Sequence, residues 1–65
     1  MKNTVREVAI VRDVDNNDIY FGETVVECRE YCQLNNITGG NGEYIAIGDF
    51  DESDRYFDIA DYEEI

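Results

Sequence analysis

The chain of 65 residues contains no histidine, no proline and no tryptophan, and only five of its side chains are basic. Histidine is the usual general base at neutral pH, so its absence argues against acid–base catalysis and favours a protein that is not an enzyme. The longest apolar run, Val8–Val11, is far shorter than the roughly 20 residues that a membrane-spanning helix requires. The start of the chain, Met1–Thr4, lacks the apolar stretch of a secretory signal, so we expect a cytoplasmic protein.

Acidic side chains dominate the composition, with 16 aspartates and glutamates and a formal net charge of −11 at pH 7. This charge repels nucleic acids and anionic membranes, so we expect neither as a direct partner and favour a basic protein instead. The chain is nevertheless 43% hydrophobic and contains five tyrosines and three phenylalanines, a composition that disordered acidic segments lack. We therefore predict one small folded domain, residues 1–65, with a limited core.

Apolar residues alternate with polar ones in the first part of the chain, as they do in β-strands. Residues 4–14 form the first predicted strand, with Glu7 and Asp13 on the same face. The segment 15–18 consists of aspartate and asparagine and predicts a turn, because both residues bond their own backbone and tolerate left-handed conformations. Residues 19–21 are then the returning strand of a hairpin.

A helix is predicted after this hairpin, because Thr24 and Glu27 have the spacing of a capping box. In that motif the Glu27 side chain reaches back to the backbone amide of Thr24. The residues that form the apolar stripe of this helix are Val25, Cys28, Tyr31 and Cys32. A metal site would need further cysteine or histidine ligands, which the sequence lacks. We therefore favour core packing for the two cysteines and predict no metal and no cofactor.

The second half of the chain predicts more of the sheet. Residues 43–50 carry apolar side chains on both faces, which places this strand in the middle of a sheet. The acidic C-terminal segment 51–65 is expected to be less ordered, with a short edge strand at 55–59 and a helical turn or an extended end at 61–65. The predicted fold class is α+β: a small antiparallel sheet of three or four strands, in the chain order β-β-α-β, with one helix packed on one face.

Acidic residues are densest between Asp49 and Glu64, where only Arg55 opposes them. Neither Asp13–Thr24 nor Asp49–Ala60 matches a calcium-binding loop, because both lack the glycine at position 6 and the glutamate at position 12. We interpret the acids as a surface for a basic partner, with tyrosines between them as anchors. The candidate partner-binding residues are Asp49, Asp51, Glu52, Asp54, Asp58, Asp61, Glu63, Glu64, Tyr56 and Tyr62. A second acidic patch is expected at the hairpin turn, from Asp13, Asp15 and Asp18.

Such a surface resembles nucleic acid in its charge. Duplex DNA carries one negative charge per roughly 1.7 Å of its axis, and a dense array of carboxylates can occupy a groove built for phosphates. The leading hypothesis is a DNA mimic, a stoichiometric inhibitor that blocks a nucleic-acid-binding protein by competition. The alternative is a small acidic adaptor that binds another chain through a sheet edge or its helix, with Ile59 and Ile65 as contacts. A cation-binding module is a third hypothesis, and homodimerisation is left open.

Two segments, Glu43–Asp51 (EYIAIGDFD) and Phe57–Ile65 (FDIADYEEI), resemble the EYxIxDYE and IxEYExI motifs of the ArdA antirestriction proteins. The resemblance covers most of this chain but only the first small domain of that family. It implies an antiparallel sheet with one helix, encoded by a phage or transposon and acting as a mimic of bent B-form DNA. It further implies a target in host defence, either a type I restriction–modification enzyme or another DNA- or RNA-handling enzyme such as a CRISPR effector.

Overall fold

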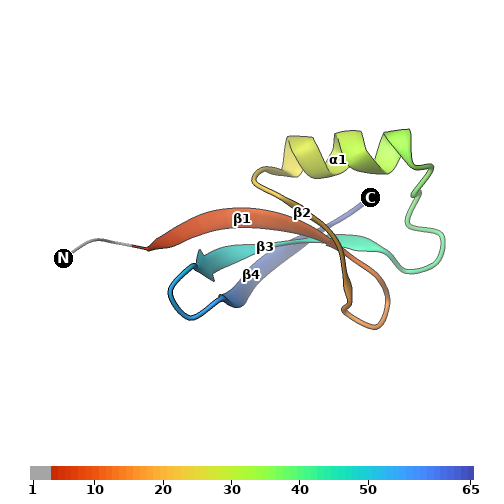
Figure 1. Ribbon diagram of the computed structural model, residues 1–65. Coiled ribbons are helices and arrows are strands. Elements are labelled where there is room, and N and C mark those ends of the chain that lie inside the picture. Colours follow the sequence, from red (N-terminus) through yellow and green to blue (C-terminus); the bar gives the residue numbers. More distant parts are fainter. Residues whose placement is uncertain (1–3) are drawn as a thin grey trace.

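The structure, a computed structural model, describes residues 4–65 as four strands and one helix. The elements are β1 (Val5–Arg12), β2 (Asp18–Gly22), α1 (Val25–Leu34), β3 (Tyr44–Asp51) and β4 (Tyr56–Glu64). Neighbouring strands pair antiparallel in the order β2-β1-β3-β4, and α1 lies on one face of the sheet (Figure 1). The predicted α+β class and the antiparallel sheet with one helix are therefore confirmed, and the sheet has four strands.

The path of the chain explains where the helix lies. Both β2 and β3 run antiparallel to β1, so they point in the same direction with β1 between them. The connection from β2 to β3 must cross over β1, and α1 forms this crossover and packs on β1, β2 and β3. Figure 1 shows α1 above only one half of the sheet, so the N-terminal half of β1 and the adjoining parts of β3 and β4 are left uncovered.

The helix begins at the predicted cap. The side chain of Thr24 accepts a hydrogen bond from the backbone amide of Glu27 at 3.2 Å, and Thr24 itself has an extended backbone. One detail of the prediction is wrong: the Glu27 carboxylate accepts from the amide of Glu23 at 2.9 Å rather than from that of Thr24. The helix ends at Asn35, and Asn36 then adopts a left-handed conformation with φ of 58°. Asparagine tolerates this conformation, which turns the chain away from the helix axis.

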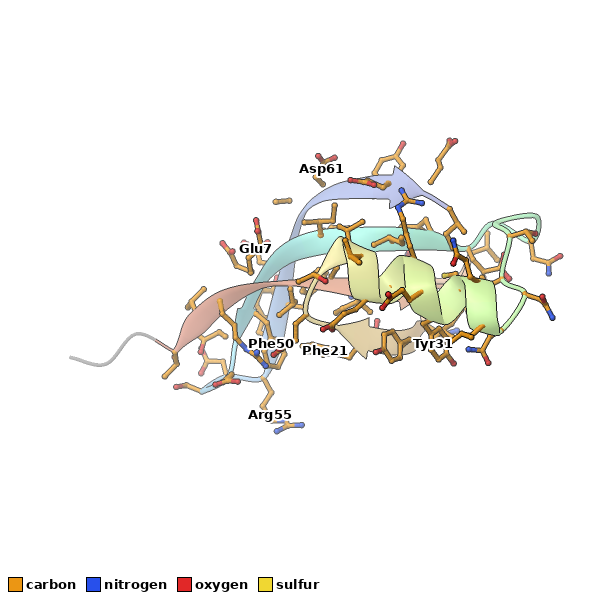
Figure 2. The ribbon with its side chains drawn as sticks, turned by 90° about the horizontal axis from the view of Figure 1, so that it is seen from above. Glu7, Phe21, Tyr31, Phe50, Arg55 and Asp61 are labelled. Carbon is orange, nitrogen blue, oxygen red and sulfur yellow. The ribbon has the colours of Figure 1, made fainter. Side chains whose placement is uncertain are left out.

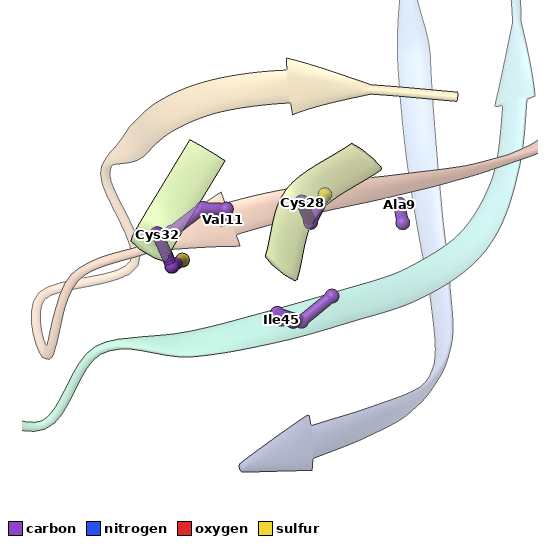
Figure 3. Close-up of a cluster of buried hydrophobic side chains, with 5 residues drawn as sticks. All are labelled: Ala9, Val11, Cys28, Cys32 and Ile45. Carbon is purple, nitrogen blue, oxygen red and sulfur yellow. The ribbon is translucent and has the colours of Figure 1, made fainter. Parts of the chain in front are cut away.

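The main core lies between the helix and the sheet. Its buried side chains are Ala9, Val11, Cys28, Cys32 and Ile45 (Figure 3). Both cysteines are free thiols that fill the space under the helix, as the sequence predicts. At the edge of this core the rings of Tyr20 on β2 and Tyr31 on α1 stack with their centroids 4.1 Å apart.

The opposite face of the sheet holds a second small core. Val8, Ile10 and Ala46 point away from the helix, yet their exposed fractions are 1% or less. Aromatic side chains surround them: Phe21 on β2 contacts Phe50 on β3 edge-on at 5.3 Å. The strands β1 and β3 are therefore buried on both faces in their central parts, which confirms the predicted central position of the strand at 43–50.

Two predicted boundaries are wrong, for different reasons. The first strand ends at Arg12 rather than at residue 14, because the Asp13 carboxylate accepts hydrogen bonds from the amides of Asp15 and Asn17 and thereby forms the turn. The C-terminal segment forms one strand of nine residues, longer than the short edge strand predicted at 55–59, and residues 61–64 adopt the extended alternative rather than the helical turn. Its pairing with β3 runs along the whole strand, and this long-range pairing outweighs the weak local preferences of the segment. Within residues 4–65 the single helix has ten residues, and no helix is suited by length and apolarity to cross a membrane.

Candidate acidic binding surface

The pairing register places three carboxylates side by side on three neighbouring strands. Glu7 of β1 lies opposite Asp49 of β3, and Asp49 lies opposite Asp58 of β4. Directly opposed residues of a sheet point to the same face. This face is the one that α1 partly covers, because Glu7 is two residues from Ala9 and Asp49 is four residues from Ile45, and both Ala9 and Ile45 belong to the core under the helix. All three carboxylates of this row are exposed, since the row lies beyond the end of the helix.

Two further acids extend the row into a surface. Asp51 follows Asp49 by two residues on β3, so it points to the same face. Asp61 lies opposite Ile47, whose side chain packs against the helix-side core, so Asp61 also points to this face. We call this surface the acidic face, and its members are Glu7, Asp49, Asp51, Asp58 and Asp61. Figure 2 shows Glu7 and Asp61 on the part of the sheet beside the helix.

The charges of this face are not balanced within the described residues. Glu7, Asp49, Asp58 and Asp61 form no ion pair with any of the arginines in residues 4–65. No group of acids in that part of the chain has the geometry to hold a metal ion. Like charges directly opposite one another in a sheet destabilise it, so the acidic face weakens the isolated fold.

Most of the arginines are used elsewhere. Arg6 forms ion pairs with Glu23 and Glu52, and its hydrogen bond to Glu23 raises the pKa of its guanidinium above the usual value. Arg12 bonds Asp18 at 2.9 Å. Arg55 lies in the turn between β3 and β4, and its side chain points away from the sheet (Figure 2).

The fourth arginine, Arg29, joins the helix to the last strand. Its guanidinium bonds the Glu63 carboxylate at 2.6 Å and the backbone carbonyl of Glu64 at 3.2 Å. Glu63 is therefore less available to a partner than the acids of the acidic face, although it points to the same side of the sheet. Glu64 lies opposite Tyr44, on the other side.

The remaining candidates from the C-terminal segment also divide between the two faces and the turn. The Asp51 carboxylate accepts hydrogen bonds from the Thr4 hydroxyl at 3.1 Å and from the Ser53 amide at 2.9 Å, so it also stabilises the β3–β4 turn. Glu52 and Asp54 lie in that turn. Tyr56 is opposite Asp51 and belongs to the helix-side face, whereas Tyr62 is opposite Ala46 and points away from it. Of the two predicted anchors, only Tyr56 is beside the acidic face.

The second predicted patch gathers at the β1–β2 turn, but two of its three acids are engaged in structure. Asp13 accepts hydrogen bonds from the amides of Asp15 and Asn17, and these bonds to its charged form hold the pKa of Asp13 below its usual value. Asp18 is paired with Arg12. Asp15 is exposed, which leaves one carboxylate of this patch for a partner.

The cysteines offer no chemistry at this surface. Burial raises the pKa of the Cys28 thiol and of the Cys32 thiol, so both stay protonated at neutral pH. A protonated, inaccessible thiol is a poor nucleophile and a poor metal ligand. Their role in the structure is to fill the core.

One member of the acidic face, Glu7, is not among the candidates predicted from the sequence. Its place in the first strand and its face were predicted, but the row forms only when β1 pairs with β3, residues about 40 positions further along the chain. The one signal in the sequence is that Glu7 shares a face with apolar core residues, Ala9 and Val11, where a charge is unusual.

The overall dimensions also compare with nucleic acid. The molecule extends 43 × 21 × 16 Å along its principal axes. All 16 carboxylates belong to the described residues, so 43 Å divided by 16 gives one carboxylate per about 2.7 Å of the long axis. Duplex DNA has one phosphate per roughly 1.7 Å of axis, and one of its strands alone has one per about 3.4 Å. The density of carboxylates lies between these two values, whereas the net charge of −11 over 43 Å is one charge per about 3.9 Å, slightly sparser than a single strand.

Comparisons with known proteins add no identification: no family model matches the chain, and no curated protein and no solved structure matches it.

Proposed function

We propose that this protein binds the nucleic-acid-binding surface of a basic protein, with its acidic face in the position of DNA phosphates. The observation that supports the proposal best is the row of Glu7, Asp49 and Asp58, which are exposed, in register and without basic partners in the described chain. Charge that serves only solubility can lie at any position on the surface. The acids of this row instead lie opposite one another, where their repulsion destabilises the fold.

The sheet makes this array of charges rigid. Neighbouring strands are about 4.8 Å apart, and residues two apart on one strand are about 6.6–6.8 Å apart, so the carboxylates form a grid with fixed spacings. β1 and β3, which carry Glu7 and Asp49, are the two central strands and are buried on both faces in their middle parts. The backbone of such a grid loses little conformational freedom when a partner docks, so only the carboxylate side chains need to be ordered, which favours affinity.

The proposed consequence is inhibition without chemistry. Lysine and arginine side chains that line a nucleic-acid groove would contact the carboxylates, and DNA or RNA could not enter while the protein is bound. Together with the resemblance to antirestriction proteins, this favours an enzyme of host defence as the target, of the type I restriction–modification or CRISPR effector class. We place this activity in the cytoplasm, where such enzymes meet foreign DNA.

The test is competition against labelled DNA on a panel of purified restriction and CRISPR nucleases, read by fluorescence anisotropy. The protein should displace DNA from at least one of them at a 1:1 ratio. A face variant, Asp49→Asn with Asp58→Asn, should lose about tenfold or more in affinity. A control variant removes the same charge from the helix, with Glu27→Gln and Glu30→Gln, and should keep near-native affinity, since glutamine at position 27 still accepts the hydrogen bond of the cap. Equal losses in both variants would contradict a defined binding face.

The alternative, an adaptor that binds through a sheet edge, is favoured by one feature. β4 is at the edge of the sheet, has nine residues and is largely exposed, including Ile59 at 46%. An unpaired edge strand can accept a strand from another chain. Such binding would tolerate the face variant and would weaken when Ile59 is replaced, so the same set of proteins separates the two functions.

A further inference from the structure

A cleft of about 700 Å³ lies between the end of the sheet and the loop at 38–43. Its walls include Tyr44 of β3, Tyr62 and Glu64 of β4, and Glu43 at the end of the loop. Tyr62 lies opposite Ala46, which lies opposite Ile10, and Ala46 and Ile10 face away from α1. Tyr44 is two residues before Ala46 on β3, so both rings point to that side of the sheet, and Glu64, opposite Tyr44, points there too. The cleft is therefore separate from the acidic face.

Two aromatic rings meet at right angles in this cleft. The centroids of Tyr44 and Tyr62 are 6.0 Å apart and their planes make an angle of 84°. The Tyr44 hydroxyl donates a hydrogen bond to the side-chain carbonyl of Asn16 at 2.5 Å, which fixes its ring. Tyr62 is 60% exposed, so much of its ring is open to a ligand.

One carboxylate, that of Glu64, accompanies the rings on this side of the sheet, and none of the described residues that line the cleft is basic. Glu43 also lines the cleft, but it directly precedes Tyr44, and its charge lies near the Cys32 thiol on the helix side. Arg29 bonds only the backbone carbonyl of Glu64, because its charge is paired with Glu63. Arg12 is beside Tyr44 in the sheet, but it is held by Asp18 and lies over the Phe57 ring at 4.9 Å.

We propose that this cleft binds the guanidinium group of an arginine side chain supplied by the protein partner. A cation within about 6 Å of an aromatic centroid is attracted by the face of the ring, and the ring of Tyr62 is open to such a contact because it is 60% exposed. A guanidinium also matches the Glu64 carboxylate with two parallel hydrogen bonds, whereas an anion would be repelled and an apolar group would leave this carboxylate unpaired. The geometry of the cleft alone supports a cation as the ligand. That this cation is an arginine of the protein partner rests on the proposed function.

The probe is N-acetyl-arginine amide, with its neutral counterpart N-acetyl-citrulline amide as a control, titrated into the intact protein. NMR spectra of the tyrosine rings should show saturable shifts at Tyr44 and Tyr62 with the arginine derivative and none at Tyr56. Tyr62→Leu should weaken this binding about two- to fivefold. The matched control is Tyr56→Leu, because Tyr56 is on the same strand with nearly the same exposure, 62%, but on the other face; its affinity should be native.

Three results would overturn the proposal: equal shifts with the citrulline derivative, equal shifts at Tyr56, or native affinity in a folded Tyr62→Leu protein. Saturable binding of tetramethylammonium without binding of the arginine derivative would assign the cleft to small amines and would also reject the arginine. The face variant Asp49→Asn with Asp58→Asn should still bind the arginine derivative natively. If the cleft does not bind the arginine derivative, the result of the competition experiment with DNA is unaffected. If the protein does not compete with DNA, the cleft can still bind the arginine derivative.

Discussion

Replacing the central member of the acidic row should make the protein more stable. Asp49 is opposed by Glu7 on one side and by Asp58 on the other, so Asp49→Asn removes two repulsive pairs at once. Opposed side chains have their Cβ atoms about 5 Å apart, and two unit charges at that distance in water repel by about 0.8 kcal/mol. Cross-strand pairs contribute about 0.2–1 kcal/mol each, so the expected gain is about 0.4–2 kcal/mol at low salt.

Thermal unfolding followed by circular dichroism measures this gain. For a domain of this size 1 kcal/mol shifts the melting temperature by about 4–8 °C, so the expected rise is about 2–16 °C. Asparagine suits the test because its β-propensity is as low as that of aspartate, which leaves charge as the main difference. At 1 M salt the screening length falls to about 3 Å, and most of the difference should disappear.

The control is Asp15→Asn in the β1–β2 turn, which removes one charge that opposes no acid across a strand pair. Its effect measures the general benefit of lowering the net charge, and it should be smaller than that of Asp49→Asn. If Asp49→Asn lowers the melting temperature, or raises it no more than Asp15→Asn does, then Glu7, Asp49 and Asp58 do not form a row of repelling charges.

Three further predictions concern the fold. Gly48→Ala should destabilise the protein by roughly 1–3 kcal/mol or more in urea unfolding, because an added Cβ would lie 2.1 Å from the backbone carbonyl oxygen of Asp58, and a loss below that range would mean that β4 can shift aside. The pKa of Asp13 is lowered in the folded state, so its contribution to stability is complete above its ordinary pKa and is lost as the pH falls through the folded-state value. Asp13→Asn should therefore flatten the acid limb of the stability curve, and an unchanged limb would contradict this assignment. The raised pKa values and burial of Cys28 and Cys32 predict that a thiol reagent reacts only as fast as the protein opens, and rapid labelling of the native protein would be inconsistent with the core described above.

Local features were the ones that the sequence predicted best. The helix follows from the Thr24 cap and the spacing of Cys28 and Cys32, all within one short segment. The central position of β3 follows from its apolar residues on both faces. The strand order and the extent of β4 depend on pairing between segments far apart in the chain, and local propensity carries little information about such pairing.

The candidate binding surface was predicted only in part, because it depends on long-range strand pairing and on a bulge in β4. Asp49 and Asp58 were candidates from composition, whereas Glu7 joins them only through the register of β1 with β3. The second reason is the irregularity in the pairing of β4 after Ile59, where Gly48 is opposite Ile59 but Ile47 is opposite Asp61. This bulge brings Asp58 and Asp61 to one face although simple alternation would separate them.

We propose that the acidic face makes the contacts with a basic nucleic-acid-binding surface. The most direct test measures the dissociation constant of the complex with a target from the panel at several salt concentrations between about 50 and 200 mM, for the native protein and for the face variant. DNA mimicry predicts that affinity falls steeply with salt for the native protein and clearly less steeply when Asp49 and Asp58 are replaced by asparagine. The same salt dependence in both proteins, or an affinity that salt does not change, would contradict it.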